Sequence, residues 1–101
     1  MNELQIDYFL AVARNLSFTK TADEMYVSQP AISRQISHLE GELGFVLFDR
    51  SKKSTQLTAA GKLYYDFFSE FKQNMQKTRD MAYKSTNEQV GSIRIACLEG
   101  W

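Results

Sequence analysis

Long hydrophobic runs, paired cysteines and an excess of either charge are all missing from this sequence of 101 residues. No apolar run approaches the roughly 18 residues that a membrane-spanning helix needs, and the N-terminus lacks the basic and apolar regions of a secretory signal. We therefore expect a cytoplasmic protein with no membrane partner. Cys97 is the single cysteine, so there is neither a disulfide framework nor a thiol cluster, and we expect no metal site.

The charge balance excludes a strongly basic protein. Lysine and arginine total 12, aspartate and glutamate total 12, and the formal net charge is zero. A nucleic-acid-binding domain is usually basic overall, so this balance counts against such a function in its simplest form. A phosphate backbone, however, meets the field of one face and not the total charge. The one real concentration of positive charge is formed by Arg50, Lys52 and Lys53.

Catalytic signatures are missing as well. Serine, histidine and aspartate all occur, but none stands in a nucleophile elbow, a metal-ligand spacing or a phosphate-binding loop. His38 and Asp49 have no evident third partner for acid–base or nucleophilic chemistry. We therefore predict that the chain is not an enzyme.

Hydrophobic spacing predicts three helices in the first half of the chain, at about residues 4–16, 19–25 and 29–43. Ser28 is a good N-cap for the third helix, and Pro30 fits its first turn, where a missing N–H costs nothing. Gly44 is expected to end that helix. Its apolar residues recur at steps of four, three and four and form a buried stripe: Ile32, Ile36, Leu39 and Leu43.

The opposite side of the third helix is small, polar and basic. It carries Pro30, Ser33, Arg34, Ser37 and Gly41. A solvated helix face more often carries long charged residues that favour helix. The composition is therefore unusual for an ordinary solvated helix face.

A β-hairpin is expected after this helix. Residues 45–48 are strand-like, residues 50–55 form a polar turn, and residues 56–58 return the chain. The hairpin places the cluster of positive charge at its tip or base.

After the hairpin, a further long helix is expected from Ala59 to the mid-80s, and Thr58 is its expected N-cap. Its apolar residues recur at three- and four-residue steps, and the small preceding domain cannot cover them all. We expect a second copy of the chain to cover them; a cofactor site is the less favoured alternative. The predicted dimerisation residues are Leu63, Tyr64, Phe67, Phe68, Phe71 and Met75.

The remaining residues predict the end of the long helix and the start of another domain. Residues 84–91 are polar and indicate a hinge, and residues 92–98 have the character of a strand with no partner. The expected organisation is a domain of three helices and a hairpin over 1–58, a linker helix over 59–88, and a hinge with the first strand of a further domain over 89–101.

Three motifs in order resemble the LysR-type transcription regulators. They are SFTKTADEMYVSQPAISRQI at 17–36, LEGELGFVLFDR at 39–50 and LTAAG at 57–61. Several motifs in the right order are far more specific than one short pattern. Thr21 departs from the family, which often has alanine at this position. The resemblance implies a mainly α winged helix-turn-helix fold, with three helices and a hairpin wing, followed by a long dimerisation helix.

The resemblance also implies sequence-specific binding of double-stranded DNA by the third helix in the major groove. Gln29 can pair with adenine, Pro30 or Ala31 can touch a thymine methyl group, and Arg34 can take a guanine or a phosphate. The full set of expected DNA-binding residues is Ser17, Thr19, Ser28, Gln29, Pro30, Ala31, Ser33, Arg34, Ser37, Arg50, Lys52 and Lys53.

Structural alternatives stay open for several of these residues. Ser17 and Thr19 suit a phosphate at a helix N-terminus, but they also suit plain capping. Ser28 to Pro30 can be a helix start alone, the basic turn can be merely solvated, and Arg50 can instead pair with a carboxylate of its own domain.

The family further implies a homodimer on an interrupted inverted repeat, and a tetramer for a full-length protein. A small-molecule inducer is expected for the effector domain, with no cofactor for these residues. The alternative function is a winged-helix module that binds proteins, which zero net charge favours. Such a module tends to expose apolar or aromatic residues on its third helix.

Overall fold

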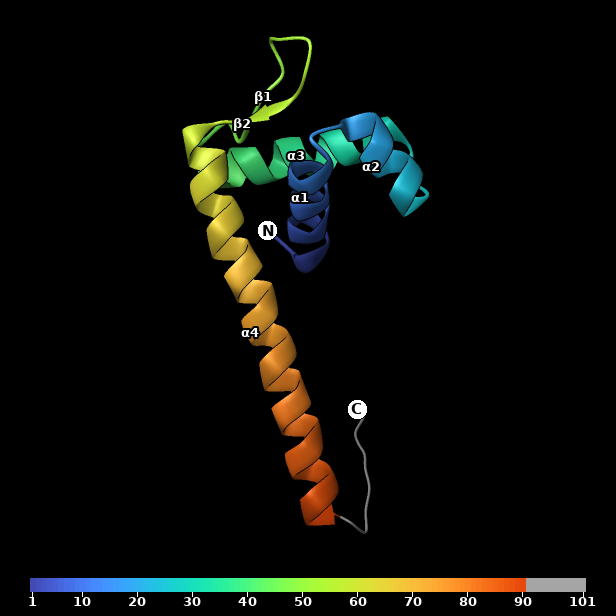
Figure 1. The fold of residues 1–101 in the computed structure, drawn as a ribbon, viewed down its shortest axis with the longest axis vertical. Helices are drawn as coiled ribbons and strands as arrows, with labels where there is room; N and C mark the ends of the chain where they lie inside the picture. The colour runs from blue at the N-terminus through green and yellow to red at the C-terminus, as the bar shows by residue number, and fades with distance from the viewer. Residues whose placement is uncertain (91–101) are drawn as a thin grey trace. The chain divides into compact units, whose positions relative to one another are not determined.

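The computed structural model describes residues 1–90, which form four α-helices and one two-stranded antiparallel sheet (Figure 1). Residues 1–69 are one compact unit and the remaining residues belong to a second, so each is described by itself. The strand predicted at 92–98 lies outside the described residues. In chain order the elements are α1 (Glu3–Asn15), α2 (Phe18–Met25), α3 (Gln29–Leu43), β1 (Phe48–Asp49), β2 (Gln56–Leu57) and α4 (Ala59–Val90).

The first two helices are delimited by polar N-caps and left-handed C-caps. The Asn2 side chain accepts a hydrogen bond from the Gln5 N–H at 2.8 Å and begins α1, which ends at Leu16 with a φ of 51°. The helix α2 ends at Tyr26 with a φ of 58°. Single residues adopt this left-handed conformation at helix ends because it lets their N–H bond back to the last turn. These two sharp stops confirm short, separate helices.

The third helix, α3, has the limits that the sequence predicts. The Ser28 hydroxyl accepts a hydrogen bond from the Ala31 N–H at 3.2 Å, and Pro30 lies in the first turn. Gly44 ends the helix with a φ of 83°, a conformation that favours glycine. Figure 1 shows α3 crossing behind α1, with α2 at its N-terminal end. The turn between α2 and α3 therefore forms a helix-turn-helix.

Aromatic rings connect the elements of the first unit through its core. Phe9 of α1 is fully buried and lies 5.4 Å from the Phe48 ring of β1 and 5.9 Å from the Phe68 ring of α4. Phe48 also meets Phe18 of α2 edge-on at 5.6 Å. Such pairs each contribute about 0.5–1.5 kcal/mol beyond their buried area. One continuous chain of rings thus fixes α2, the wing, α1 and the start of α4 relative to one another.

The wing is shorter than the sequence predicts. Only Phe48 and Asp49 pair with Leu57 and Gln56, in an antiparallel register, and residues 45–47 are not in a strand. Leu47 is instead fully buried, and its carbonyl oxygen accepts a hydrogen bond from the Thr58 N–H at 3.0 Å. Burial of Leu47 thus takes precedence over strand pairing in this segment. The winged helix-turn-helix fold itself is confirmed.

The helix α4 begins where predicted and ends later. The Thr58 hydroxyl accepts from the Gly61 N–H at 3.0 Å and donates to the Val46 carbonyl at 2.6 Å, so it caps α4 and ties it to the segment before the wing. The hinge predicted from Lys84 is helical through Val90. Lysine, glutamate and glutamine are good helix formers, and no proline or glycine stands between Gly61 and Gly91 to stop the helix.

Candidate nucleic-acid interface

The outer face of α3 exposes the residues that the sequence predicts for base contacts. Gln29, Pro30, Arg34 and Ser37 are exposed, and Ala31 and Ser33 are half-buried. This face is available because the opposite stripe is in the core: Ile32, Ile36 and Leu39 are at most 2% exposed. No aromatic or large aliphatic side chain is present among these outward residues. The face therefore has the chemistry of a base-reading surface and not that of an apolar docking surface.

The start of α2 is capped and accessible. The Ser17 hydroxyl accepts a hydrogen bond from the Lys20 N–H at 3.0 Å, so Ser17 has the capping role that the sequence left open. Thr19 is exposed in the first turn. Free N–H groups and the helix dipole favour a phosphate at such an end, and capping does not prevent that contact.

The family departure at Thr21 has a structural explanation. Thr21 is fully buried, and its hydroxyl donates to the Ser17 carbonyl oxygen at 2.7 Å. The same hydroxyl accepts from the Asn15 side-chain amide at 3.0 Å. The extra polar group of Thr21 is therefore satisfied, and it fastens the end of α1 to the start of α2.

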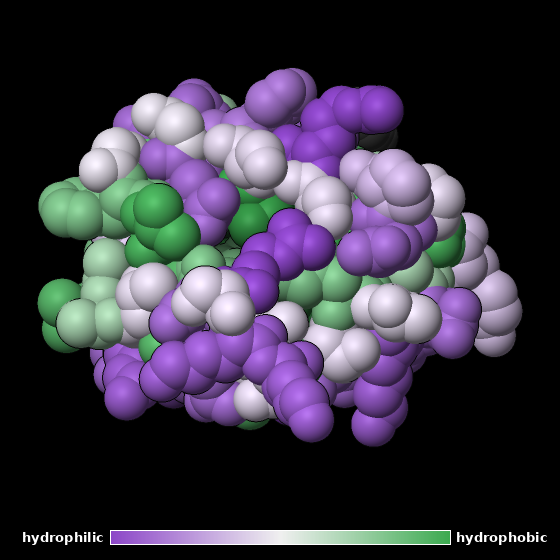
Figure 2. All heavy atoms as spheres, turned by 90° about the horizontal axis from the view of Figure 1, so that it is seen from above, coloured by the Kyte–Doolittle hydropathy of each residue, from purple (hydrophilic) through white to green (hydrophobic). Residues whose placement is uncertain are grey.

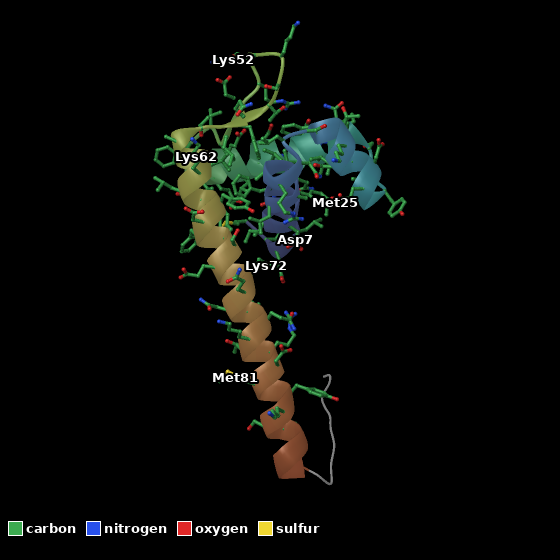
Figure 3. All side chains as sticks on the ribbon, in the orientation of Figure 1. Asp7, Met25, Lys52, Lys62, Lys72 and Met81 are labelled. Atoms are coloured by element: carbon green, nitrogen blue, oxygen red, sulfur yellow. The ribbon has the colours of Figure 1, made fainter. Side chains whose placement is uncertain are left out.

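The wing loop carries the predicted basic cluster in an ordered turn. The Asp49 carboxylate accepts from the Ser51 hydroxyl at 2.6 Å and from the Ser51 N–H at 3.0 Å. The hydroxyl hydrogen bond is the main cause that lowers the pKa of Asp49, followed by the backbone hydrogen bond. Lys52 and Lys53 follow this turn and are exposed. Figure 3 labels Lys52 at the tip of the loop.

Arg50 lies against an aromatic ring. Its guanidinium carbon is 3.8 Å from the centroid of the Phe18 ring. Among the described residues Arg50 has no ion pair, so the alternative of a carboxylate partner within the domain is wrong. Because Phe18 is the first residue of α2, this contact places the wing arginine beside the start of that helix.

The surface seen from the wing side is mostly hydrophilic (Figure 2). Hydrophobic side chains gather at one margin, the side on which Figure 1 shows α4 beginning. The exposed large hydrophobic residues of that part of the chain are Phe45, Val46, Leu63 and Phe67. The polar surface suits contact with a polyanion, and the apolar margin is a separate feature.

Two supporting contacts were not predicted from the sequence. Glu40 of α3 accepts hydrogen bonds from the backbone N–H groups of Leu47 at 2.7 Å and Phe48 at 3.4 Å. Gln5 of α1 donates its amide to the Gln35 side-chain oxygen of α3 at 3.0 Å. Both contacts hold α3 to its neighbours. No spacing rule reveals them, because a motif records which residues are present and not which side chain contacts which backbone group after folding.

The predicted dimerisation residues divide into two groups. Leu63 is 73% exposed and Phe67 is 62% exposed, whereas Phe68 is 2% exposed. Phe68 packs against Phe9 and stacks on half-buried Tyr64 at 5.6 Å. The prediction that Phe68 faces a partner chain is therefore wrong, because positions 64 and 68 share the inner side of α4. In the second unit, Phe71 is 38% exposed and Met75 is half-buried.

Within residues 1–90, none of the helices combines the length and the apolar character that crossing a lipid bilayer requires.

Comparison with known proteins gives one consistent result. Residues 4–62 match the family model described as the bacterial regulatory helix-turn-helix protein, lysR family. A RuBisCO operon transcriptional regulator of Allochromatium vinosum is 37% identical over 91% of this chain and 30% of its own length. The glycine cleavage system transcriptional activator of Escherichia coli is 38% identical over 97% of this chain and 31% of its own length. The chain thus spans about a third of the length of these relatives.

Solved structures agree with this result. The BenM DNA-binding domain in complex with the catB site 1 DNA has a TM-score of 0.84 at 32% identity, covering 88% of this chain and 96% of that one. The CbnR DNA-binding domain in a DNA complex has a TM-score of 0.80 at 34% identity, covering 84% of this chain and 98% of that one. The relatives are transcription regulators and these neighbours are DNA-bound. The chain therefore belongs to the LysR family of bacterial helix-turn-helix regulators and is a DNA-binding domain of that family.

Proposed function

We propose that this domain reads a specific double-stranded DNA sequence by placing the first half of α3 in the major groove. The observation that carries the proposal is the outward face of α3, where Gln29, Pro30 and Arg34 are exposed. They follow Ser28, whose hydroxyl caps the N-terminus of this helix. Gln29 has the amide needed to pair with adenine, Pro30 offers apolar contact to a thymine methyl group, and Arg34 has the fork that fits guanine or phosphate. Ala31, Ser33 and Ser37 complete the reading surface.

Backbone contacts fix the position of α3 in this proposal. Ser17 and Thr19 bind a phosphate at the start of α2, and Ser28 does so at the start of α3. Lys52 and Lys53 follow the backbone or minor groove from the wing. Between Asp49 and Asp66 the sequence has four basic residues and no acidic residue, so this stretch is locally basic despite zero net charge.

The domain acts as a homodimer in this proposal. Leu63 and Phe67 expose large apolar side chains on α4, which a second chain would cover. A two-fold axis then presents two α3 helices to an interrupted inverted repeat. A longer protein with an effector domain would form a tetramer in the bacterial cytoplasm and respond to a small-molecule inducer; these residues themselves need no cofactor and catalyse no reaction.

The test is DNA binding by Arg34→Ala at several salt concentrations. Binding to a fluorescent duplex that carries an interrupted inverted repeat from the gene's own promoter region is compared with binding to a scrambled duplex. We expect the substitution to cost about 1–3 kcal/mol on the repeat. A smaller loss on the scrambled duplex would assign Arg34 to a guanine, and an equal loss would assign it to a phosphate. The control, Lys77→Ala, removes the same charge from an exposed position of α4 outside the proposed contacts.

Two outcomes would contradict the proposal. Equal losses for the Arg34 and Lys77 variants would mean that total charge, not the α3 face, determines affinity. Absence of salt-sensitive binding by the folded wild-type protein would favour the protein-binding module instead, since counterion release accompanies every phosphate contact.

A further inference from the structure

We propose that Phe18 is a positioning residue for DNA binding: its ring holds the Arg50 guanidinium in place at the start of α2, ready for a phosphate. The proposal rests on the DNA-binding function described above and adds a residue that contacts no DNA itself. Its basis is the 3.8 Å separation between the Arg50 guanidinium carbon and the Phe18 ring centroid.

The ring is a rigid support. Phe18 is only 4% exposed, and its ring meets Phe48 at 5.6 Å with an interplanar angle of 75°. Phe48 in turn packs on fully buried Phe9. Movement of the Phe18 ring would disturb two further core rings, so the surface offered to Arg50 is fixed by the fold.

Stacking leaves the donors of Arg50 available. A guanidinium over an aromatic face is held by attraction to the ring, while its N–H groups point outward in its own plane. Arg50 has no ion pair among the described residues, so no carboxylate competes for those donors. A preorganised arginine also loses less side-chain entropy when it binds a phosphate than a free one does.

The position of the Phe18 ring brings the wing arginine to the start of α2. Phe18 lies between Ser17 and Thr19, so the guanidinium is held next to the end of α2 already assigned to the phosphate backbone. The wing arginine and the start of α2 then address the same stretch of DNA. Lys52 and Lys53, which are exposed in the same loop, have no ring support.

A double-mutant cycle separates this role from plain core packing. Phe18→Leu, Arg50→Ala and the double variant are compared by fluorescence anisotropy on the inverted-repeat duplex, with concentrations corrected for the folded fraction. We expect Phe18→Leu to weaken binding by roughly two- to fivefold when Arg50 is present, and by much less in the Arg50→Ala background. Arg50→Ala alone should reduce the salt dependence by about one phosphate contact.

The matched control is the same cycle with Lys52→Ala, another cation of this loop. The loss caused by Phe18→Leu should be unchanged in the Lys52→Ala background. A loss that is equal in the Arg50→Ala background, or no loss at all, would overturn the proposal and leave Phe18 as a core residue only.

A second variant tests the idea with Phe18 and the core intact, in case Phe18→Leu does not fold. Arg50→Lys keeps the charge but loses the planar fork, so we expect an affinity well below wild type; wild-type affinity would overturn the proposal. Failure of the inference is distinguishable from failure of the DNA-binding function. In the first case wild type still binds in an Arg34-dependent manner, and in the second it does not bind at all.

Discussion

At the scale of single residues, an acidic side chain supports the DNA-binding surface. Glu40 lies on the same helix as the outward face of α3, and its carboxylate accepts hydrogen bonds from the backbone N–H groups of Leu47 and Phe48. It replaces the hydrogen bonds that these N–H groups would make to water or to a longer strand. Its role is to hold the beginning of the wing against α3.

Glu40→Ala should lower the free energy of unfolding by about 1–3 kcal/mol, because it leaves buried backbone donors without acceptors. Glu40→Gln keeps an acceptor oxygen and should lose clearly less. Urea denaturation followed by circular dichroism measures both. Equal stability of the alanine variant and wild type would mean that these two hydrogen bonds contribute nothing net.

Residue types with strong local rules were predictable, and residues defined by distant contacts were not. Ser28, Gly44 and Thr58 were predicted as caps, and each is one, because capping depends on neighbours three or four residues away. The roles of Glu40 and Phe18 depend on segments that meet only after folding. Their partners lie seven or more residues away in the chain, beyond the reach of any spacing rule.

At the scale of elements, the described glycines differ most at the junction between the wing and α4, where Gly61 lies directly against the backbone of Leu47. A Cβ atom added at Gly61 would clash with the Leu47 carbonyl oxygen, whereas nothing lies within 4 Å of a Cβ atom added at Gly41. The close approach lets α4 begin directly against the segment before the wing. Both glycines are helical, so they form a natural comparison.

Gly61→Ala should destabilise the domain by about 1–3 kcal/mol, because backbone must move to relieve the contact. Gly41→Ala should stabilise it by about 0.5–1 kcal/mol through helix propensity alone. Thermal denaturation of the two variants checks the opposite signs. A gain in stability for Gly61→Ala would show that α4 can shift away from Leu47 without cost.

Periodicity identified the helices but not every face of α4. Apolar spacing placed Phe67 and Phe68 together in one seam, since adjacent residues both fit a broad apolar stripe. The structure separates them: Phe68 is in the core and Phe67 is 62% exposed. Which apolar residue turns inward depends on where α1 packs, and this is tertiary information. The hinge predicted from Lys84 was wrong for a different reason. Polar composition alone does not stop a helix, and α4 extends through Val90.

At the scale of the whole molecule, the apolar surface of α4 is large enough to need a covering partner. Leu63 and Phe67 expose large apolar side chains on α4, and Phe45 and Val46 are exposed as well. Several exposed apolar side chains in one part of a surface are typical of an interaction site. The predicted occupant is a second copy of the chain.

The double variant Leu63→Asp, Phe67→Asp should convert a dimer of the 101-residue chain to a monomer with little loss of folded structure. The reason is that both side chains are exposed within the chain, and a carboxylate in a dimer seam would be buried without a partner. Sedimentation velocity reports the mass. The control is Tyr26→Asp, a similar apolar-to-acidic change at a side chain that is 94% exposed on the turn between α2 and α3. A variant that stays dimeric would place the interface elsewhere.

The fastening of the wing at both ends restricts where the chain can change in length. Before the loop, Leu47 is held by Glu40 through its N–H and by Thr58 through its carbonyl oxygen. After the loop, Leu57 pairs with Phe48. Insertions or deletions at either end would break these contacts, whereas residues 51–54 are all exposed. Length variation, and with it the reach of the wing, is therefore confined to this short segment.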